Sequence, residues 1–381
     1  MEAPIRTGAD LDRVERAMAT LRHLFAGAGF SPVEPRHLFP ADTLLDLYGE
    51  DVRTRAFLFT DPLAGRELCL RPDFTVPVAL AHGQGGWSRP GAYSYGGPVF
   101  RRQEPGATRP VEYRQAGIES FGEADTASAD ARVFALMREG IDRLGAGAVR
   151  IETGDLGIVF ALLDALAMPQ ARRRQLRRHV WRPARFHALI EGYLAPVADR
   201  SPRRRALLAA VAAGDDAVAA LAEGEGDPVG LRSIAEIAER ARALAAAAEE
   251  PPMAAEQGAL IEAVLAVEAP APQALSRLRD LAAGAGVDLA CALERFEARL
   301  DALFRGGIAA DTLPFKAAFG RNLEYYSGFV FEMTAAQGGL PPLAGGGRYD
   351  AMTRRLGADA AVPAVGGMIR PETVLTAGEQ A

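Results

Sequence analysis

Strand-like segments lie on both sides of a long helical stretch, and this order limits the folds open to the chain. Residues 156–305 are rich in Ala, Leu and Arg at helical spacing, whereas the segments before and after them carry the aromatic, β-branched and turn residues of strands. A regular series of parallel βαβ units does not give this order. We therefore expect an α+β fold with a mixed, mainly antiparallel sheet flanked by helices, divided into residues 1–155, a mostly helical insertion at 156–305, and residues 306–381.

Turn residues and periodicity place the individual elements. Asp10 precedes apolar residues that step by three and four, and Gly27 follows them, as at the two ends of a helix. The expected elements are a helix at 11–27, a hairpin at 57–71, a short helix from about 76, antiparallel strands at 92–103 and 111–122, a helix at 125–144, and strands at 148–155, 312–320 and 329–334.

Composition argues against several classes of function. The 381 residues carry a net charge of −6 and are 49% hydrophobic, so no charge excess points to nucleic acid or membrane as a partner. The start has no apolar signal-peptide region and no run of about eighteen apolar residues occurs, so we expect a cytoplasmic protein. Two cysteines and five scattered histidines indicate neither a disulfide framework nor a metal site, and we expect no cofactor.

Alternation with period two divides the strand at 111–121 into two faces. One face carries Tyr113, Gln115, Gly117, Glu119 and Phe121. A glycine between an amide and a carboxylate lets a ligand approach the backbone, which favours a pocket floor. A solvated face with a bulge fits the same pattern, and the pattern alone favours it.

Three polar residues before this strand have two interpretations each. Asp73 and Thr75 stand two apart after a strand, where a carboxylate and a hydroxyl can hold an ammonium group or can cap the next helix. Arg101 can offer a planar guanidinium to a carboxylate or phosphate, or can form a surface salt bridge. Taken singly, the cap and the salt bridge are the simpler interpretations.

The later motifs are weak signals by themselves. Arg321, Tyr325 and Tyr326 stand beside a Ser-Gly turn, and paired tyrosines there are typical of core and rim positions. The segment AGGGRYD, residues 344–350, has the composition of a phosphate-binding loop but lacks the Lys-Ser/Thr of a P-loop. An arginine cluster can meet RNA phosphates or an acidic partner, or can form a solvated helix face; its members are Arg172, Arg173, Arg174, Arg177, Arg178, Arg182 and Arg185.

Taken together, these segments resemble the motifs of one enzyme family in the same order. FRRQEPGATRPVEYRQAGIESFG, residues 100–122, resembles motif 2 of the class II aminoacyl-tRNA synthetases in its histidyl-tRNA synthetase form. LRPDFT, RNLEYYSGFVFE, AGGGRYD and PAVGG resemble the histidine-binding and glycine-rich segments of that enzyme. The resemblance extends from about Leu11 to Val374, is weakest in the helical middle, and implies a class II synthetase-like fold.

The resemblance implies a pocket for free histidine. Arg101 and Gln115 match positions that handle the amino-acid carboxylate, and Asp73 and Thr75 match positions that hold the α-amino group. A zwitterion needs a cation at one end and an anion at the other, which this set supplies.

The imidazole end of the implied pocket falls on the second strand and the tyrosine pair. Glu119 and Tyr326 match positions that recognise the ring, with Tyr325 beside them. Arg321 falls where the synthetase has its catalytic, histidine-specific arginine.

Departures from the synthetase pattern concern its nucleotide and tRNA functions. The glutamate that recognises adenine in motif 2 is Gln103 here, and a second arginine of that motif is Val111. In PAVGGMIRPETVL, residues 363–375, Thr373 stands where the ATP-binding arginine is expected, and threonine offers no cation to a triphosphate. Pro371 fits the first turn of a closing helix. We expect no counterpart of the anticodon-binding domain that follows in the synthetase.

A synthetase-like body without that domain resembles the regulatory subunits of ATP phosphoribosyltransferase, the first enzyme of histidine biosynthesis. The resemblance implies a non-catalytic subunit with no catalytic residues of its own and with histidine as effector. It implies a dimer formed through the first helix and the strand near Pro35, assembled with the short-form catalytic subunit into a hetero-oligomer. Two alternatives stay open. One is a histidine-activating, adenylate-forming ligase, which the retained Arg101 and Arg321 favour, and the other is an RNA-binding module that uses the arginine cluster.

Overall fold

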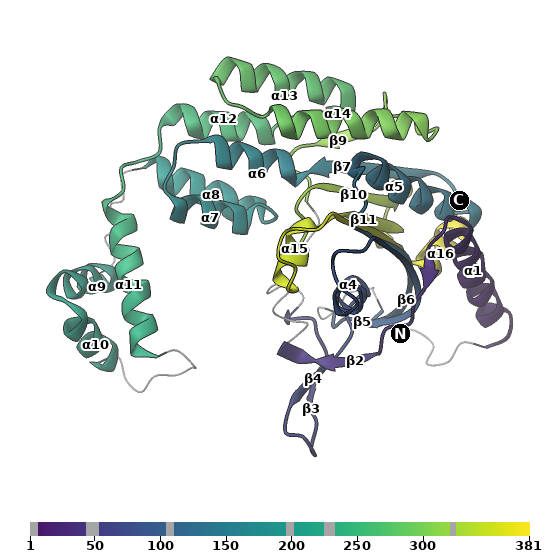
Figure 1. The fold of residues 1–381 in the computed structure, drawn as a ribbon, viewed down its shortest axis with the longest axis horizontal. Helices are drawn as coiled ribbons and strands as arrows, with labels where there is room; N and C mark the ends of the chain where they lie inside the picture. Colours follow the sequence, from purple (N-terminus) through teal and green to yellow (C-terminus); the bar gives the residue numbers. More distant parts are fainter. Residues whose placement is uncertain (1–6, 43–52, 104–109, 196–201, 225–232, 321–324) are drawn as a thin grey trace. The chain divides into compact units, whose positions relative to one another are not determined.

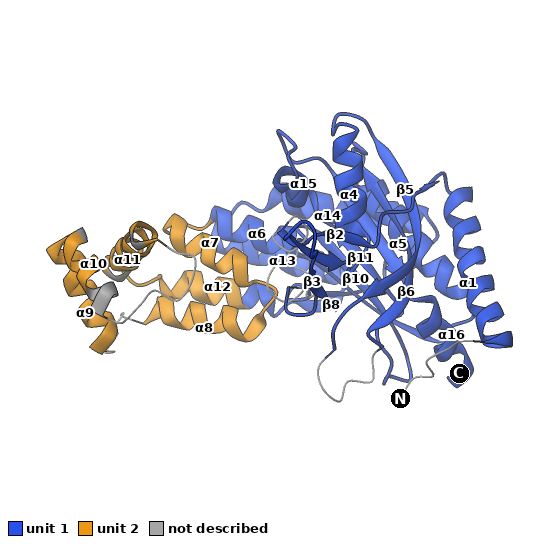
Figure 2. Ribbon diagram, turned by 90° about the horizontal axis from the view of Figure 1, so that it is seen from below, with its two compact units in different colours: residues 1–165, 263–381 blue, residues 166–262 orange. Residues whose placement is uncertain are grey.

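The computed structural model describes residues 7–42, 53–103, 110–195, 202–224, 233–320 and 325–381. The chain forms two compact units, a larger one of residues 1–165 and 263–381 and a smaller one of residues 166–262 (Figure 2). The smaller unit spans fewer residues, 166–262, than the helical insertion expected at 156–305. Helices at both ends of that stretch belong to the larger unit, because their apolar faces pack beside the sheet.

A nine-stranded sheet forms the centre of the larger unit. Its strands are β1 Ser31–Pro32, β5 Gly91–Phe100, β6 Glu112–Phe121, β7 Val149–Asp155, β8 Glu268–Pro270, β9 Pro314–Lys316, β10 Phe329–Ala335, β11 Ala344–Arg348 and β12 Ala364–Ile369. They lie in the order β1-β5-β6-β12-β11-β10-β7-β9-β8. The β1–β5 and β7–β9 pairs are parallel and the other six pairs are antiparallel. The predicted mixed, mainly antiparallel sheet is confirmed.

Helices cover the sheet. Those of the larger unit are α1 Gly8–Gly27, α4 Thr75–Gln84, α5 Thr126–Arg143, α6 Leu156–Ala165, α13 Ala271–Ala285, α14 Ala290–Arg305, α15 Asp350–Arg355 and α16 Pro371–Gln380, while α12 Ala255–Leu265 crosses the boundary between the units. The Asp125 side chain accepts a hydrogen bond from the backbone N–H of Ser128 at 3.0 Å, which caps α5 at the start of the helix predicted at 125–144. Pro371 is the first residue of α16, also as predicted.

Two opposite faces of β12 meet different parts of the molecule. A Cβ added at Gly367 would collide with Met137 of α5, whereas one added at Gly366 would collide with the Glu119 carboxylate. Successive residues of a strand point to opposite faces, so α5 covers one face of the sheet and Glu119 lies on the other, where α4 packs (Figure 1).

The hairpin predicted at 57–71 is confirmed as part of a second sheet. Strands β2 Leu38–Pro40, β3 Leu58–Thr60 and β4 Glu67–Leu70 pair antiparallel in the order β2-β4-β3. Pro35, near which a strand was expected, lies in the connection between β1 and β2.

The glycine-rich segment 344–350 is a strand rather than a phosphate-binding loop. Residues Ala344–Arg348 form β11, pair with β10 on one side and β12 on the other, and are buried throughout. Glycine is needed here because a Cβ on Gly346 would collide with the Gly366 carbonyl and the Phe331 ring. The glycines therefore allow close packing across the middle of the sheet.

The smaller unit consists of helices. They are α7 Gln170–His179, α8 Pro183–Leu194, α9 Pro202–Ala213, α10 Asp215–Gly224 and α11 Ile234–Glu249, with most of α12. The arginine cluster lies on α7 and α8, except for Arg182, which precedes α8 as its N-cap residue. Arg172 is buried and contacts the Glu250 carboxylate at 2.8 Å and the Pro251 carbonyl at 2.8 Å, whereas Arg174, Arg178 and Arg185 are exposed. At least one member of the cluster is therefore a packing residue.

Candidate functional site

Glu119 is the centre of a buried hydrogen-bond network on β6. Only 1% of its surface is exposed. Oε1 accepts hydrogen bonds from the hydroxyls of Thr75 at 2.8 Å and Tyr95 at 3.3 Å, and Oε2 accepts one from the hydroxyl of Tyr349. The solvated-face interpretation of this strand is wrong, because α4, the neighbouring strands and these hydroxyls cover it.

Burial dominates the ionisation of Glu119. It raises the pKa of the carboxyl group to about 8, because a carboxylate loses its hydration in the interior. Hydrogen bonds from Tyr349 and Thr75 act in the opposite direction, and the charge of Asp73 adds to the increase in pKa. A ligand that brings an N–H donor or a positive charge would therefore favour the carboxylate form of Glu119.

A small cavity lies against this network. It is lined by Asp73, Thr75, Tyr95, Arg101, Gln115, Tyr325, Tyr326, Gly345, Tyr349, Gly366, Gly367 and Met368. Glu119 is behind the hydroxyls of the wall and does not line the cavity itself. The volume of about 20 Å³ holds about one water molecule. Entry of anything as large as an amino acid requires lining side chains to move.

The buried side-chain amide of Gln115 indicates that this cavity binds a ligand. Its side chain is 1% exposed, and within the described parts of the chain neither Nε2 nor Oε1 has a hydrogen-bond partner. A buried amide left unpaired costs about 1–3 kcal/mol, so such groups are rare unless a ligand or water completes them. The amide lies in the cavity wall, where a bound molecule would supply its partners.

Asp73 and Arg101 each form a hydrogen bond with the backbone and also line the cavity. Oδ1 of Asp73 accepts a hydrogen bond from the backbone N–H of Thr75 at 3.1 Å, next to the start of α4. Oδ2 faces Nη2 of Arg101 at 3.7 Å, and Nε of Arg101 donates to the Pro72 carbonyl at 2.7 Å. Arg101 is thus part of the cavity wall and not of a surface salt bridge.

The structure brings seven of the eight predicted site residues together. Asp73, Thr75, Arg101, Gln115, Tyr325 and Tyr326 line one cavity and Glu119 lies behind it. The eighth, Arg321, lies outside the described residues. Sequence reasoning missed the other two donors to Glu119, Tyr95 and Tyr349. A signal for Tyr95 was present, because it stands opposite Gly117 in a pair of strands that could be aligned from their turn.

Membrane-spanning helices and metal-binding clusters are both absent from the described residues. None of their helices combines the length and the apolar composition of a membrane span. Nor do these residues contain a group of three or more His, Cys, Asp or Glu side chains placed to hold a metal ion.

Comparison with known proteins identifies the family. The profile of the histidyl-tRNA synthetase family matches residues 7–254 and 236–374. ATP phosphoribosyltransferase regulatory subunits of Mesorhizobium japonicum and Agrobacterium fabrum are each 40% identical to this chain, over 91% and 90% of its length and 93% and 91% of theirs. The chain belongs to the family of ATP phosphoribosyltransferase regulatory subunits.

Solved structures support the fold of this regulatory-subunit family member. A Bacillus halodurans protein described as an ATP phosphoribosyltransferase regulatory subunit/histidyl-tRNA synthetase matches with a TM-score of 0.69 and 21% identity, covering 99% of this chain and 83% of that one. Histidyl-tRNA synthetase from Nostoc matches with a TM-score of 0.62 and 16% identity, covering 98% of this chain and 75% of that one. The class II synthetase-like fold is confirmed.

Gln103, where the resemblance implies a residue that recognises adenine, and Arg370 both have contacts within this regulatory-subunit family member. Nε2 of Gln103 donates to the carbonyls of Arg101 at 3.1 Å and Pro110 at 3.3 Å, which ties together the two ends of the motif 2 loop. The Arg370 guanidinium lies 5.6 Å from the centroid of the Tyr113 ring and donates to the Pro342 carbonyl. The side chains of Gln103 and Arg370 therefore donate hydrogen bonds to backbone carbonyls of this chain.

Proposed function

We propose that this chain is the non-catalytic regulatory subunit of an ATP phosphoribosyltransferase and that free histidine, the end product of the pathway, is its effector. The family relationship supports the regulatory role. The unpaired amide of Gln115 is the observation that carries the histidine pocket, because a buried amide in a cavity wall needs a ligand to complete it.

The chemistry of the cavity wall suits a zwitterion with a polar ring. Arg101 is a cation for the carboxylate, Asp73 is an anion for the ammonium group, and Gln115 offers both a donor and an acceptor. An imidazole N–H directed at Glu119 would replace a hydroxyl donor and favour the charged form of the carboxyl group.

Histidine can bind only if side chains that line the small cavity move, and we propose that this movement transmits the regulatory signal. The cavity of about 20 Å³ is too small for histidine. To reach Glu119, the ligand has to displace a hydroxyl such as that of Tyr349, which stands between β11 and α15. Histidine then favours a conformation different from the closed one, and a typical allosteric coupling of about 1–3 kcal/mol follows.

We further propose that the chain pairs as a dimer through α1 and the β1–β2 region near Pro35, and that the dimer assembles with a short-form catalytic subunit. Reconstitution tests this proposal. Phosphoribosyl transfer by the catalytic subunit should depend on this chain, and histidine should reduce it only when the chain is present. Equal activity with and without the chain, together with no effect of histidine, would refute the proposal.

A ligase that activates histidine is the alternative, favoured by the retention of Arg101 in the cavity wall. Histidine-dependent exchange of pyrophosphate into ATP separates the two functions. We expect no exchange, because Gln103 and Thr373 replace the groups that would hold ATP and the Gln103 amide is engaged with its own loop.

A further inference from the structure

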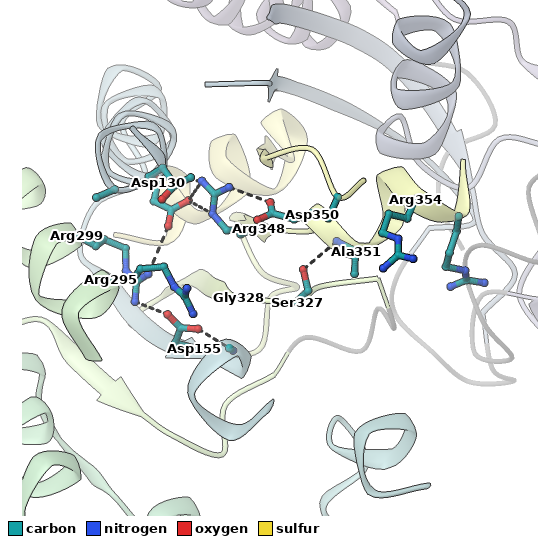
Figure 3. Close-up of a pocket in the computed structure, with 15 residues that line it drawn as sticks. Asp130, Asp155, Arg295, Arg299, Ser327, Gly328, Arg348, Asp350, Ala351 and Arg354 are labelled. Atoms are coloured by element: carbon teal, nitrogen blue, oxygen red, sulfur yellow. Dashed lines mark hydrogen bonds and ion pairs between the residues drawn. The ribbon is translucent and has the colours of Figure 1, made fainter. Parts of the chain in front are cut away.

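A second and much larger cavity lies in the same unit, and neither the synthetase-like pocket nor the regulatory role accounts for it. Its volume is about 770 Å³, within the range of about 300–1,000 Å³ that is usual for small-molecule sites. Residues of α5, α14 and α15 line it together with Ser327 and Gly328 (Figure 3). Five arginines and three aspartates are among them, an excess of two positive charges in a chain whose net charge is −6.

The floor of this cavity is a buried chain of ion pairs. Arg299 donates to Asp155 at 2.6 Å and lies 3.4 Å from Asp130. Arg348 donates to Asp130 at 2.7 Å and to Asp350 at 2.9 Å (Figure 3). Each guanidinium is held by two carboxylates, so the floor is a rigid scaffold and its charges largely compensate one another.

The mouth of the cavity has a different character. Arg295, Arg354 and Arg355 line it and are exposed. Among the residues that the structure describes, neither Arg295 nor Arg354 forms an ion pair with a carboxylate. Nη1 of Arg295 donates a hydrogen bond to the Cys291 sulfur at 3.2 Å. Like charges gathered at a concave surface raise the local concentration of anions, because low-dielectric walls focus their field.

A carboxylate, that of Asp350, and a hydroxyl, that of Ser327, also line this cavity. Oδ1 of Asp350 accepts from Arg348 and from the backbone N–H of Ala364, which leaves Oδ2 as an acceptor on a side chain that is 31% exposed. The Ser327 hydroxyl accepts a long hydrogen bond of 3.4 Å from the Ala351 N–H. Both groups can bond hydroxyls of a ligand while an arginine holds its anionic end.

We propose that this cavity binds a phosphorylated metabolite that carries hydroxyl groups, such as a sugar phosphate. The phosphate contacts Arg354, because guanidinium groups match phosphate oxygens in bidentate geometry. Arg295 lies on the other side of Ser327 and Asp350 (Figure 3) and adds to the positive potential of the cavity. The hydroxyl-bearing part contacts Ser327 and Asp350. A volume of about 770 Å³ is larger than inorganic phosphate needs, which favours an organic phosphate.

This site is separate from the histidine pocket, although the two share their wall. Tyr326 lines the small cavity and the next residue, Ser327, lines the large one; Tyr349 and Arg348 divide in the same way. Successive residues face opposite sides of a shared segment. A sugar phosphate therefore does not compete with histidine for contacts.

Calorimetric titration of the full chain with ribose 5-phosphate tests the proposal. We expect saturable binding below about 10 mM in dilute salt, weakened at least about tenfold in the Arg295→Gln/Arg354→Gln double variant. Arg305→Gln removes the same charge from α14 outside the cavity lining and should change the affinity by less than about twofold. Ser327→Ala should weaken binding of ribose 5-phosphate but not of inorganic phosphate.

Three results would overturn the proposal: no saturable binding, equal weakening in Arg305→Gln, or inorganic phosphate binding as tightly as ribose 5-phosphate. Histidine titration of the same variants gives an independent readout. Histidine binding should be retained in the double variant, because neither arginine lines the small cavity. The two titrations therefore test the histidine pocket and the phosphate site separately.

Discussion

The hydroxyl of Tyr349 donates a hydrogen bond to Oε2 of Glu119, although 230 residues separate them in the chain. Glu119 belongs to β6 and Tyr349 follows β11, and β12 lies between these strands. Gly366 of β12 stands opposite Glu119 and has no side chain, so the carboxylate can lie across that strand toward the tyrosine. The candidate histidine pocket is built around this contact.

Replacement of Glu119 should abolish histidine binding. Glu119→Ala removes the proposed partner of the imidazole, and Glu119→Gln keeps the shape while it removes the charge. Loss of a hydrogen bond to a charged group corresponds to about 1.5–3 kcal/mol, or about ten- to a hundredfold in affinity, for the Gln variant. Calorimetry with histidine measures this, with Glu112→Ala on the exposed end of β6 as control. Unchanged affinity in Glu119→Gln would show that the residue correspondence is wrong.

Gln115→Leu should change stability and binding in opposite directions. Without ligand, the variant removes a buried unpaired amide and should raise the free energy of unfolding by about 1 kcal/mol. With histidine, it removes a donor and an acceptor and should weaken binding. Urea unfolding and calorimetry measure the two effects. A variant that loses stability but binds histidine normally would contradict the assignment of Gln115 to the pocket.

Stability should depend on pH through Glu119. Burial raises the pKa of its carboxyl group from 4.5 to about 8, so the folded state binds a proton that the unfolded state releases between these values. The contribution of this group is fully present below about pH 4.5 and is lost as the pH rises through about 8. Glu119→Gln cannot titrate, so the difference in unfolding free energy between wild type and variant should decline across this window. Parallel pH profiles would exclude a raised pKa.

Glycine at position 366 should be essential for the pocket. Gly366→Ala places a Cβ against the Glu119 carboxylate, so we expect lower stability and loss of histidine binding. Gly192 lies within α8 with open space at its Cβ position, and Gly192→Ala should raise stability by about 0.5–1 kcal/mol. Thermal unfolding and histidine titration of both variants provide the comparison. Normal binding by Gly366→Ala would mean that the carboxylate does not need its present position.

The buried ion pairs of the large cavity should be critical for folding. Arg299→Met leaves Asp130 and Asp155 buried without this cation and should destabilise the protein by about 3–5 kcal/mol. Arg279→Met breaks an exposed ion pair with Glu297 and should have little effect. Urea unfolding measures both. Similar small losses in the two variants would show that the cavity floor is solvated.

Much of the fold was predictable because its signals are local. The strands β5 and β6, the α5 helix with its Asp125 cap and the hairpin at β3–β4 follow from alternation, capping and turn residues within about ten positions of each other. The limits of the smaller unit were not predictable, since α6, α13 and α14 have the same helical composition as α7–α11 and differ in what they pack against.

The site was only partly predictable for the same reason. Order and spacing of motifs pointed to Asp73, Gln115 and Glu119, but the simpler interpretations of each residue alone were a cap or a solvated face. The large arginine-lined cavity gave no sequence signal at all, because Asp130, Arg299 and Arg348 come from three distant segments.

The sequence by itself determined which residue types lie on each face of β6 and that helices begin near Asp125 and Pro371. It also showed that Gln103 and Thr373 stand where the synthetase resemblance implies ATP-binding residues. Only the tertiary structure decided that Tyr95 and Tyr349 cover Glu119, that the Gln115 amide is unpaired among the described residues, and that the glycine-rich segment is a strand. The physical reason is that backbone periodicity and caps depend on neighbours in sequence. Burial, pKa and hydrogen-bond partners depend on segments that meet only when the sheet has formed.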